Sequence, residues 1–153
     1  MHIRIRPLEE NDAYTSYKWR NDPEVFKYTG NTYKHEITLE SELNWIRRVI
    51  TNQNEFRCAI IVDDVYVGNV YLTDIADGKA WFHIFIGDRR YWGKGVARIA
   101  TQLILEYGKA NLALKTIQLS AHPDNLSAIN LYSRLGFHKT EVKNSRQTMT
   151  LIL

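Results

Sequence analysis

Two glycines, Gly93 and Gly95, lie between an apolar, strand-like run and a helix-like run. Glycine carries no side chain and adopts backbone conformations that other residues avoid, so such a loop can turn its N–H groups toward a ligand. The start of a helix offers unpaired N–H groups and a partial positive charge, and Lys94 and Arg98 add full charges. The pattern predicts a phosphate site, most simply one for the pyrophosphate of a larger cofactor.

The spacing excludes two common phosphate loops. A Walker-type loop ends in Gly-Lys-Ser/Thr, and this chain has no such triplet at Gly95-Val96. A dinucleotide fingerprint needs a third glycine where Arg98 stands, and an acid at the next strand, whereas the strand-like run 115–121 contains none. One structural alternative stays open, namely glycines that only allow tight packing at a helix start.

A second group of residues with chemical potential begins at Asn125. Asn125 can cap a helix, because its side chain accepts from backbone N–H groups of the first turn. Ala128 and Tyr132 are four residues apart and share one face of that helix. Gly136 is suited to end the helix, and Phe137 opens a strand-like run.

Together, the two groups resemble the GNAT superfamily of acetyl-CoA-dependent N-acetyltransferases. The family loop reads Gln/Arg-x-x-Gly-x-Gly/Ala, and the stretch 92–97 follows it except that Trp92 stands at the first position. That Trp and the segment 19–24, Trp-Arg-Asn-Asp-Pro-Glu, are similar to the RimJ/RimL-like branch, which acetylates N-termini of ribosomal proteins. The resemblance covers essentially the whole chain.

The resemblance implies acetyl-CoA as cosubstrate, bound in a gap between the fourth and fifth strands. The strand before the loop would bind the pantetheine arm through its main chain, and one N–H would polarise the thioester carbonyl. Asn125 would bond the pantetheine or its surroundings, besides capping its helix. The cofactor-binding residues expected from the strand and the loop are Ile84, Phe85, Ile86, Trp92, Gly93, Lys94, Gly95, Val96, Ala97 and Arg98.

Tyr132 is the expected general acid. By the resemblance, its hydroxyl lies near the thioester sulfur and protonates the departing thiolate, which is plausible chemistry for a phenol with a pKa near 10. A core tyrosine on a helix face is the alternative.

The general base is not evident, because Ser120 and Trp81 stand where related N-terminal acetyltransferases place a glutamate. His122, His83 and Glu24 are the candidates, since imidazole titrates near neutral pH and Glu24 lies in the segment that helps to form the acceptor site. An amine of modest pKa can also lose its proton through ordered water, without a dedicated base.

The acceptor is expected to be a small amine, an aminosugar or a protein N-terminus. Aromatic side chains could form its wall or belong to the core: Tyr14, Tyr17, Trp19, Tyr28, Tyr33 and Trp45. Acidic side chains could attract a cationic amine or form a solvated face: Glu24, Glu36, Glu40 and Glu42. Two other functions stay open, a non-catalytic acyl-CoA-binding domain and a plain nucleotide-phosphate or nucleic-acid binder.

The composition bounds the remaining choices. A chain of 153 residues with 44% hydrophobic and 24% charged residues fits one globular domain, expected to span 1–153. The net charge of +3 is too small to argue for nucleic acid. No apolar run is long enough for a membrane span, and the strand-like N-terminus has no signal-peptide block, so we expect a cytoplasmic protein without a membrane partner.

Histidines and the cysteine complete this picture. The five histidines do not pair with ligands at zinc spacing, so no metal is expected, and Cys58 in its apolar run is expected to be a buried thiol. Whether the protein is a monomer or a homodimer stays open.

The elements that must position these residues follow from periodicity. Strands are expected at 3–6, 56–62, 66–73, 80–86, 115–121, 137–142 and 147–153, and helices at 9–19, 38–52, 94–110 and 125–135. Antiparallel strands followed by a strand–helix–strand unit predict an α+β domain. Its expected form is a mixed, mostly antiparallel central sheet of about seven strands with helices on both faces, the GNAT acyl-CoA N-acyltransferase fold.

Overall fold

The structure, a computed structural model, describes residues 1–27 and 36–153. Its strands are β1 (Ile3–Pro7), β2 (Phe56–Val62), β3 (Val65–Ala76), β4 (Lys79–Ile86), β5 (Thr116–Ala121), β6 (His138–Lys143) and β7 (Arg146–Ile152). Its helices are α1 (Ala13–Arg20), α2 (Leu39–Ile50), α3 (Val96–Asn111) and α4 (Leu126–Arg134). Two short 3-10 helices are η1 (Glu10–Asp12) and η2 (Arg89–Tyr91).

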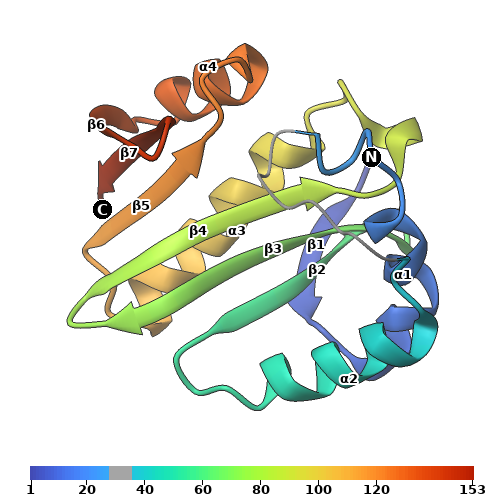
Figure 1. Ribbon diagram of the computed structural model, residues 1–153. Helices are drawn as coiled ribbons and strands as arrows, with labels where there is room; N and C mark the ends of the chain where they lie inside the picture. The colour runs from blue at the N-terminus through green and yellow to red at the C-terminus, as the bar shows by residue number, and fades with distance from the viewer. Residues whose placement is uncertain (28–35) are drawn as a thin grey trace.

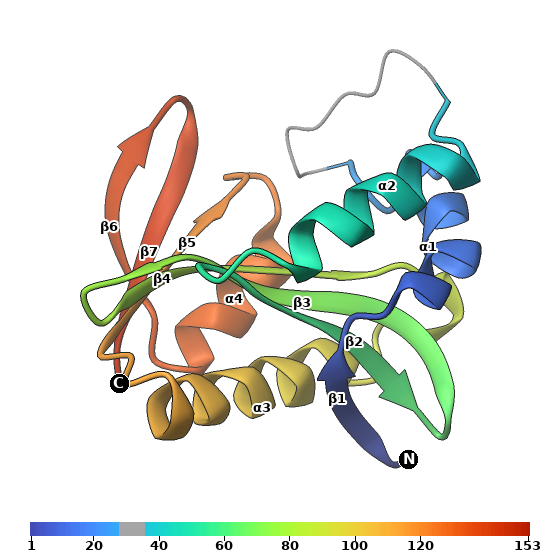
Figure 2. The same ribbon diagram turned by 90° about the horizontal axis from the view of Figure 1, so that it is seen from below.

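All seven strands form one sheet in the order β1-β2-β3-β4-β5-β7-β6. Every neighbouring pair is antiparallel except β4 and β5, which run parallel. Helices α1 and α2 cover one face of the sheet and α3 covers the other (Figure 2). The expected fold class, a mixed and mostly antiparallel sheet between helices, is confirmed.

The sheet opens in its middle. β4 and β5 pair only from Lys79 to Trp81 and from Thr116 to Gln118. Beyond that point the two strands diverge (Figure 1), and within the described residues no further pairing between them is found. The N–H and C=O groups on that side of β4 therefore face the gap, where a ligand can take the place of a strand.

Two apolar clusters hold the layers together. The larger cluster joins α3 and α4 to the sheet through side chains such as Leu72, Ile104, Leu119 and Met149, which are at most 2% exposed. The smaller cluster lies under α2 and includes Ile46. Alternating strand residues point to opposite faces, so β2 contributes Cys58 and Ile60 to the larger cluster and Ala59 and Ile61 to the smaller one.

Cys58 belongs to the larger cluster, and burial raises its pKa to about 12. It is therefore a packed thiol at neutral pH and not a thiolate nucleophile.

Most element ends lie within two residues of expectation, and three of the differences have a physical reason in the structure. The helix expected at 9–19 begins with the 3-10 turn η1, where Asp12 accepts from the N–H of Glu9, and becomes α-helical only at Ala13. The helix expected from Lys94 begins at Val96, because Gly95 adopts a left-handed conformation that a helix cannot include. β3 extends to Ala76, beyond the expected end at 73, because the turn at Asp77 and Gly78 closes a longer hairpin with β4.

Candidate active site

The loop between β4 and α3 is shaped by two left-handed glycines. Gly93 has φ of 70° and Gly95 has φ of 79°, a region that costs other residues about 1–2 kcal/mol. A Cβ at Gly95 would meet only Arg98 Nη2, at 4.0 Å, so backbone conformation and not crowding requires glycine here. Gly95 is also the N-cap of α3 and offers no side-chain cap, which leaves the first helical N–H groups for a ligand.

Side chains around η2 fix this loop. The indole Nε1 of Trp92 donates to the carbonyl of Ile86 at 2.8 Å, so the ring closes the loop onto the end of β4. Asp88 accepts from the Arg90 N–H and from its guanidinium, and this bonding to Arg90 lowers the pKa of Asp88. Trp92, which replaces the polar residue of the motif, thus acts as a brace for the loop.

One cleft of about 1170 Å³ extends from the loop into the gap between β4 and β5 and on toward α1 and α2. Of the residues expected to be catalytic or to bind the cofactor, Lys94 alone does not line it, and its ammonium lies 5.7 Å from the centre of the Tyr91 ring. The others meet there from distant parts of the chain: Glu24, His83, Ile84, Phe85, Ile86, Trp92, Gly93, Gly95, Val96, Ala97, Arg98, His122, Asn125 and Tyr132.

Tyr132 lies on α4 with its ring among aromatic core residues. It contacts Phe82 and Phe137 edge-on, with ring centres 5.9 Å and 5.8 Å away. Burial raises the pKa of Tyr132 above its ordinary value, so the hydroxyl stays protonated throughout the working pH range. No described residue hydrogen-bonds to this hydroxyl, so it is available to a ligand in the cleft.

Asn125 caps α4, as expected from its type and position. Its side-chain oxygen accepts from the N–H of Ala128 at 3.3 Å. Because Asn125 also lines the cleft, capping places its amide at the wall where β5 and α4 meet.

His83 faces the cleft from β4, on the same side of the sheet as α1 and α2. Its Nε2 lies 3.0 Å from the hydroxyl of Thr73. When Nε2 carries the proton and donates to Thr73, Nδ1 is unprotonated and can accept a proton. The ring is accessible from the cleft, yet its pKa is lowered, chiefly by desolvation in the surrounding protein and then by the charge of Arg57. The imidazole therefore stays neutral down to a lower pH than an ordinary histidine does.

The other two base candidates are held differently. His122 Nδ1 accepts from the backbone N–H of Asp124 at 3.1 Å, which uses that nitrogen in a local turn. Glu24 is exposed at the outer part of the cleft. Ser120 receives a hydrogen bond from Arg146 Nε at 2.8 Å, so it has a partner other than His122.

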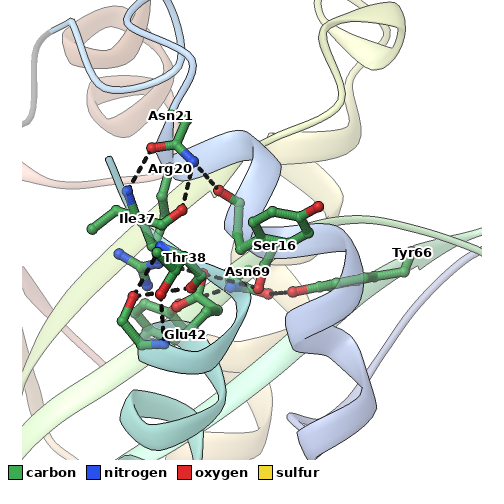
Figure 3. A network of polar contacts seen from close by, with 11 residues as sticks. Ser16, Arg20, Asn21, Ile37, Thr38, Glu42, Tyr66 and Asn69 are labelled. Atoms are coloured by element: carbon green, nitrogen blue, oxygen red, sulfur yellow. Dashed lines mark hydrogen bonds and ion pairs between the residues drawn. The ribbon is translucent and has the colours of Figure 1, made fainter. Parts of the chain in front are cut away.

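Glu42 is neither a solvated acid nor an acceptor ligand. It is 1% exposed and accepts from Ser16 at 3.1 Å and from Arg20 at 2.8 Å (Figure 3). Burial raises its pKa, while Arg20 and the hydrogen bonds oppose that shift. Glu36 and Glu40 are exposed, as a solvated face requires.

The expected aromatic wall is divided between core and cleft. Trp19 packs in the interior, where a Cβ on Gly87 would lie 2.0 Å from its ring, and Tyr14 is exposed. Trp45 lines the cleft, together with Phe26 and Tyr71. Tyr28 and Tyr33 lie outside the described residues.

Sequence reasoning missed a row of cleft residues that crosses three strands. Arg57 on β2 lies opposite Tyr71 on β3, and Tyr71 lies opposite His83 on β4. The signal was one basic residue in an otherwise apolar strand, but only the strand register brings these three together.

Two features are absent from the parts of the chain that the structure describes. They contain no helix long and apolar enough to cross a membrane. Nor do they bring three or more His, Cys, Asp or Glu side chains together in a way that could hold a metal ion.

The family model described as acetyltransferase (GNAT) domain matches residues 2–138. The chain belongs to the GNAT acetyltransferase family. It is 31% identical over 137 residues to spermidine N(1)-acetyltransferase of Escherichia coli K12, covering 88% of this chain and 72% of that protein. It is 28% identical to an uncharacterized N-acetyltransferase p20 of Bacillus licheniformis, covering 90% and 79% of the two chains.

Solved structures agree on the fold. Spermidine N-acetyltransferase of Vibrio cholerae, in complex with CoA and spermine, superposes with a TM-score of 0.88 at 22% identity, covering 98% of this chain and 95% of that one. As a GNAT protein, this chain is an acyltransferase that uses acetyl-CoA to acetylate an amine. The glycine loop, the free helix N-terminus and the open edge of β4 fit that cosubstrate.

Proposed function

We propose that this cleft binds acetyl-CoA and a primary amine together and transfers the acetyl group directly between them. One observation carries the proposal: the phosphate loop, the open strand edge, Tyr132 and His83 all line the same continuous cleft. Direct transfer needs the two substrates side by side, and this cleft continues past β4 into a second compartment under α1 and α2.

The cofactor half would work through main-chain groups. The N–H groups at the start of α3, with Arg98 nearby, would hold the pyrophosphate. The main chain of Ile84, Phe85 and Ile86, which faces the gap, would align the pantetheine arm as an added strand does. An N–H from this stretch would polarise the thioester carbonyl.

The Tyr132 hydroxyl would donate a hydrogen bond to the sulfur as the C–S bond breaks. Its raised pKa keeps the proton on the oxygen, so the group is always ready as a donor. Tyr132 passes its proton to the departing thiolate, and the base takes one proton from the neutral amine as the amide forms; proton exchange through water returns both groups to their starting states, so the reaction balances.

His83 is the base that we propose, ahead of His122 and Glu24. Its lowered pKa leaves the ring neutral at neutral pH, and Nδ1 can accept the amine proton directly or through water while Nε2 donates to Thr73. His122 uses Nδ1 in a turn, and Glu24 lies at the rim.

The finer assignments rest on sequence features. Trp92 and the segment 19–24 support a place in the RimJ/RimL-like branch, whereas the polyamine enzymes among the relatives show that the family model alone does not fix the acceptor. We also propose a single domain over 1–153 that acts in the cytoplasm as a monomer or homodimer, without nucleic acid or membrane partners.

Release of free CoA thiol from acetyl-CoA tests the proposal. The amine panel comprises aminosugar nucleotides, polyamines, aminoglycosides, amino acids and short peptides. We expect at least one amine to stimulate thiol release and to be recovered as its N-acetyl derivative. If acetyl-CoA binds but no amine is acetylated, the proposal fails and a non-catalytic acyl-CoA-binding domain takes its place.

A further inference from the structure

Arg57 on β2 lies in the acceptor half of the cleft, two strands away from His83 on β4. Arg57, Tyr71 and His83 are direct cross-strand neighbours on one face of β2, β3 and β4, so adjacent Cβ atoms are about 4.5–5.5 Å apart. All three line the cleft. Asn69, which is fully buried, donates to the Tyr71 hydroxyl at 2.8 Å and fixes the middle of this row.

Arg57 is held so that one edge of its guanidinium is used and the other is available. Its Nε donates to Glu55 at 2.8 Å, and its central carbon lies 4.2 Å from the Tyr71 ring centre and 5.0 Å from that of Trp45. No described residue accepts from its two terminal nitrogens. A planar guanidinium presented in this way is suited to two oxygens of a carboxylate or phosphate.

The aromatic faces of Trp45 and Tyr71, which could hold a second ammonium group, are already covered by cations. Arg20 lies 4.0 Å from the Trp45 ring centre and is anchored by Glu42 (Figure 3), and Arg57 covers Tyr71. Around them, among the residues that the structure describes, the lining holds as many basic as acidic side chains: Arg20, Lys27 and Arg57 against Glu24, Glu55 and Asp74. A polyamine needs an excess of acids, which this compartment does not offer.

We propose that the acceptor is a small amine that also carries an anionic group, a carboxylate or a phosphate, and that the terminal nitrogens of Arg57 bind this group. The inference rests on the proposed function and names its substrate class. Strands β2 and β4 are about 10 Å apart, and Arg57 leans toward β4 over Tyr71, so a few bonds separate amine and anion in the acceptor.

The same contact links binding to deprotonation. Arg57 lowers the pKa of His83, whereas Asp74 and Glu55 raise it. An anion bound to Arg57 offsets its charge and raises the proton affinity of His83 when an acceptor is present.

Three series of equal chain length test the acceptor class: ω-amino acids, their carboxamides, and α,ω-diamines, with spermidine added. An aminoalkyl phosphate series shows which anion is preferred. We expect kcat/KM for the amino acids or the phosphates to exceed that for the carboxamides by about 10- to 100-fold, the factor for one lost charged hydrogen-bonding partner. Equal or better turnover of carboxamides or diamines would overturn the proposal.

Arg57→Gln and Arg57→Lys assign the effect to this side chain. We expect Arg57→Gln to bring the ratio of kcat/KM for anionic acceptors over that for carboxamides close to one, and Arg57→Lys to restore part of that ratio. Arg47→Gln, an exposed arginine on α2 outside the cleft lining, is the matched control. Arg57→Gln/Glu55→Gln, which leaves no unpaired carboxylate at position 55, serves if Arg57→Gln does not fold.

Calorimetry on the CoA-bound protein separates this inference from the proposed function. If no amine is acetylated but an ω-amino acid binds and Arg57→Gln abolishes that binding, the anion subsite stands and the proposed function fails. If amines are acetylated but binding of anionic acceptors does not depend on Arg57, the function stands and the subsite is wrong.

Discussion

At the scale of single residues, the site depends on what burial does to ionisable groups. The pKa of Tyr132 is raised and that of His83 is lowered, so each group starts in the protonation state that its proposed role needs. At neutral pH the phenol of Tyr132 is protonated and the imidazole of His83 is neutral. Both shifts arise chiefly from the protein walls that also form the cleft.

Tyr132→Phe tests the hydrogen bond to the sulfur. The ring contacts with Phe82 and Phe137 survive, so folding and acetyl-CoA affinity should change little. We expect kcat to fall by about 10²-fold or more, as for loss of general acid catalysis. Steady-state kinetics and binding isotherms measure the two quantities, with exposed Tyr107→Phe as control. A drop in affinity with unchanged kcat would assign Tyr132 to binding instead.

His83→Gln tests the base through pH. Because burial and Arg57 lower the pKa of His83, the acid limb of kcat/KM that it causes should have its midpoint below about 6.5 and vanish in the variant. The limb due to the acceptor amine should remain. His138→Gln, exposed on β6, is the control. An unchanged low-pH limb would exclude His83 as the base.

The same shift affects stability. Folding lowers the pKa of His83, so the unfolded chain binds the proton more tightly. The contribution of His83 to the free energy of unfolding is complete above its ordinary pKa. It is lost as the pH falls through the lowered pKa of the folded protein. Between the lowered pKa and about 6.5, the free energy of unfolding should therefore rise more steeply with pH for wild type than for His83→Gln, and above about 6.5 the two slopes should be equal; urea unfolding at several pH values measures both.

At the scale of elements, the junction of β4, the loop and α3 is the proposed anchor of the cofactor. Gly95→Glu puts a side chain with a poor left-handed conformation and a negative charge at a helix start that favours anions. We expect acetyl-CoA binding to be lost in calorimetry while the far-ultraviolet circular dichroism is kept. Gln102→Glu adds the same charge on an exposed position of α3 and should bind normally. Normal binding by folded Gly95→Glu would refute the loop assignment.

At the scale of the whole molecule, the sheet consists of two parts that share only a short parallel pairing. Strands β1–β4 and β5–β7 meet at Lys79–Trp81 and Thr116–Gln118. A cosubstrate that lies in the gap contacts both parts and stabilises their arrangement. Binding of acetyl-CoA should therefore raise the free energy of unfolding.

Acetyl-CoA at 100 times its Kd should stabilise the fold by about 2.7 kcal/mol and raise Tm by about 5–10 °C. Hydrogen exchange of amides at 82–86 should slow, because that edge of β4 faces the gap. Adenosine monophosphate, which lacks the pantetheine arm, should not slow it. Stabilisation without a change in exchange on β4 would place the cosubstrate elsewhere.

Local signals were sufficient for much of the fold. Period-two strands, the turn at Asp63 and Asp64 and the cap at Asn125 depend on neighbouring residues, so they were predicted close to their observed bounds. Helix starts were less accurate, since η1 and Gly95 depend on backbone details that residue type fixes poorly.

The sequence by itself determined the strands, the helices and the two motifs, because each is encoded in residues a few positions apart. Only the tertiary structure decided that Glu42 is a buried partner of Arg20 and that Arg57 and Tyr71 share a row with His83. These facts depend on strand register and helix packing between segments far apart in the chain. Such contacts form through burial of whole faces, which no local pattern specifies.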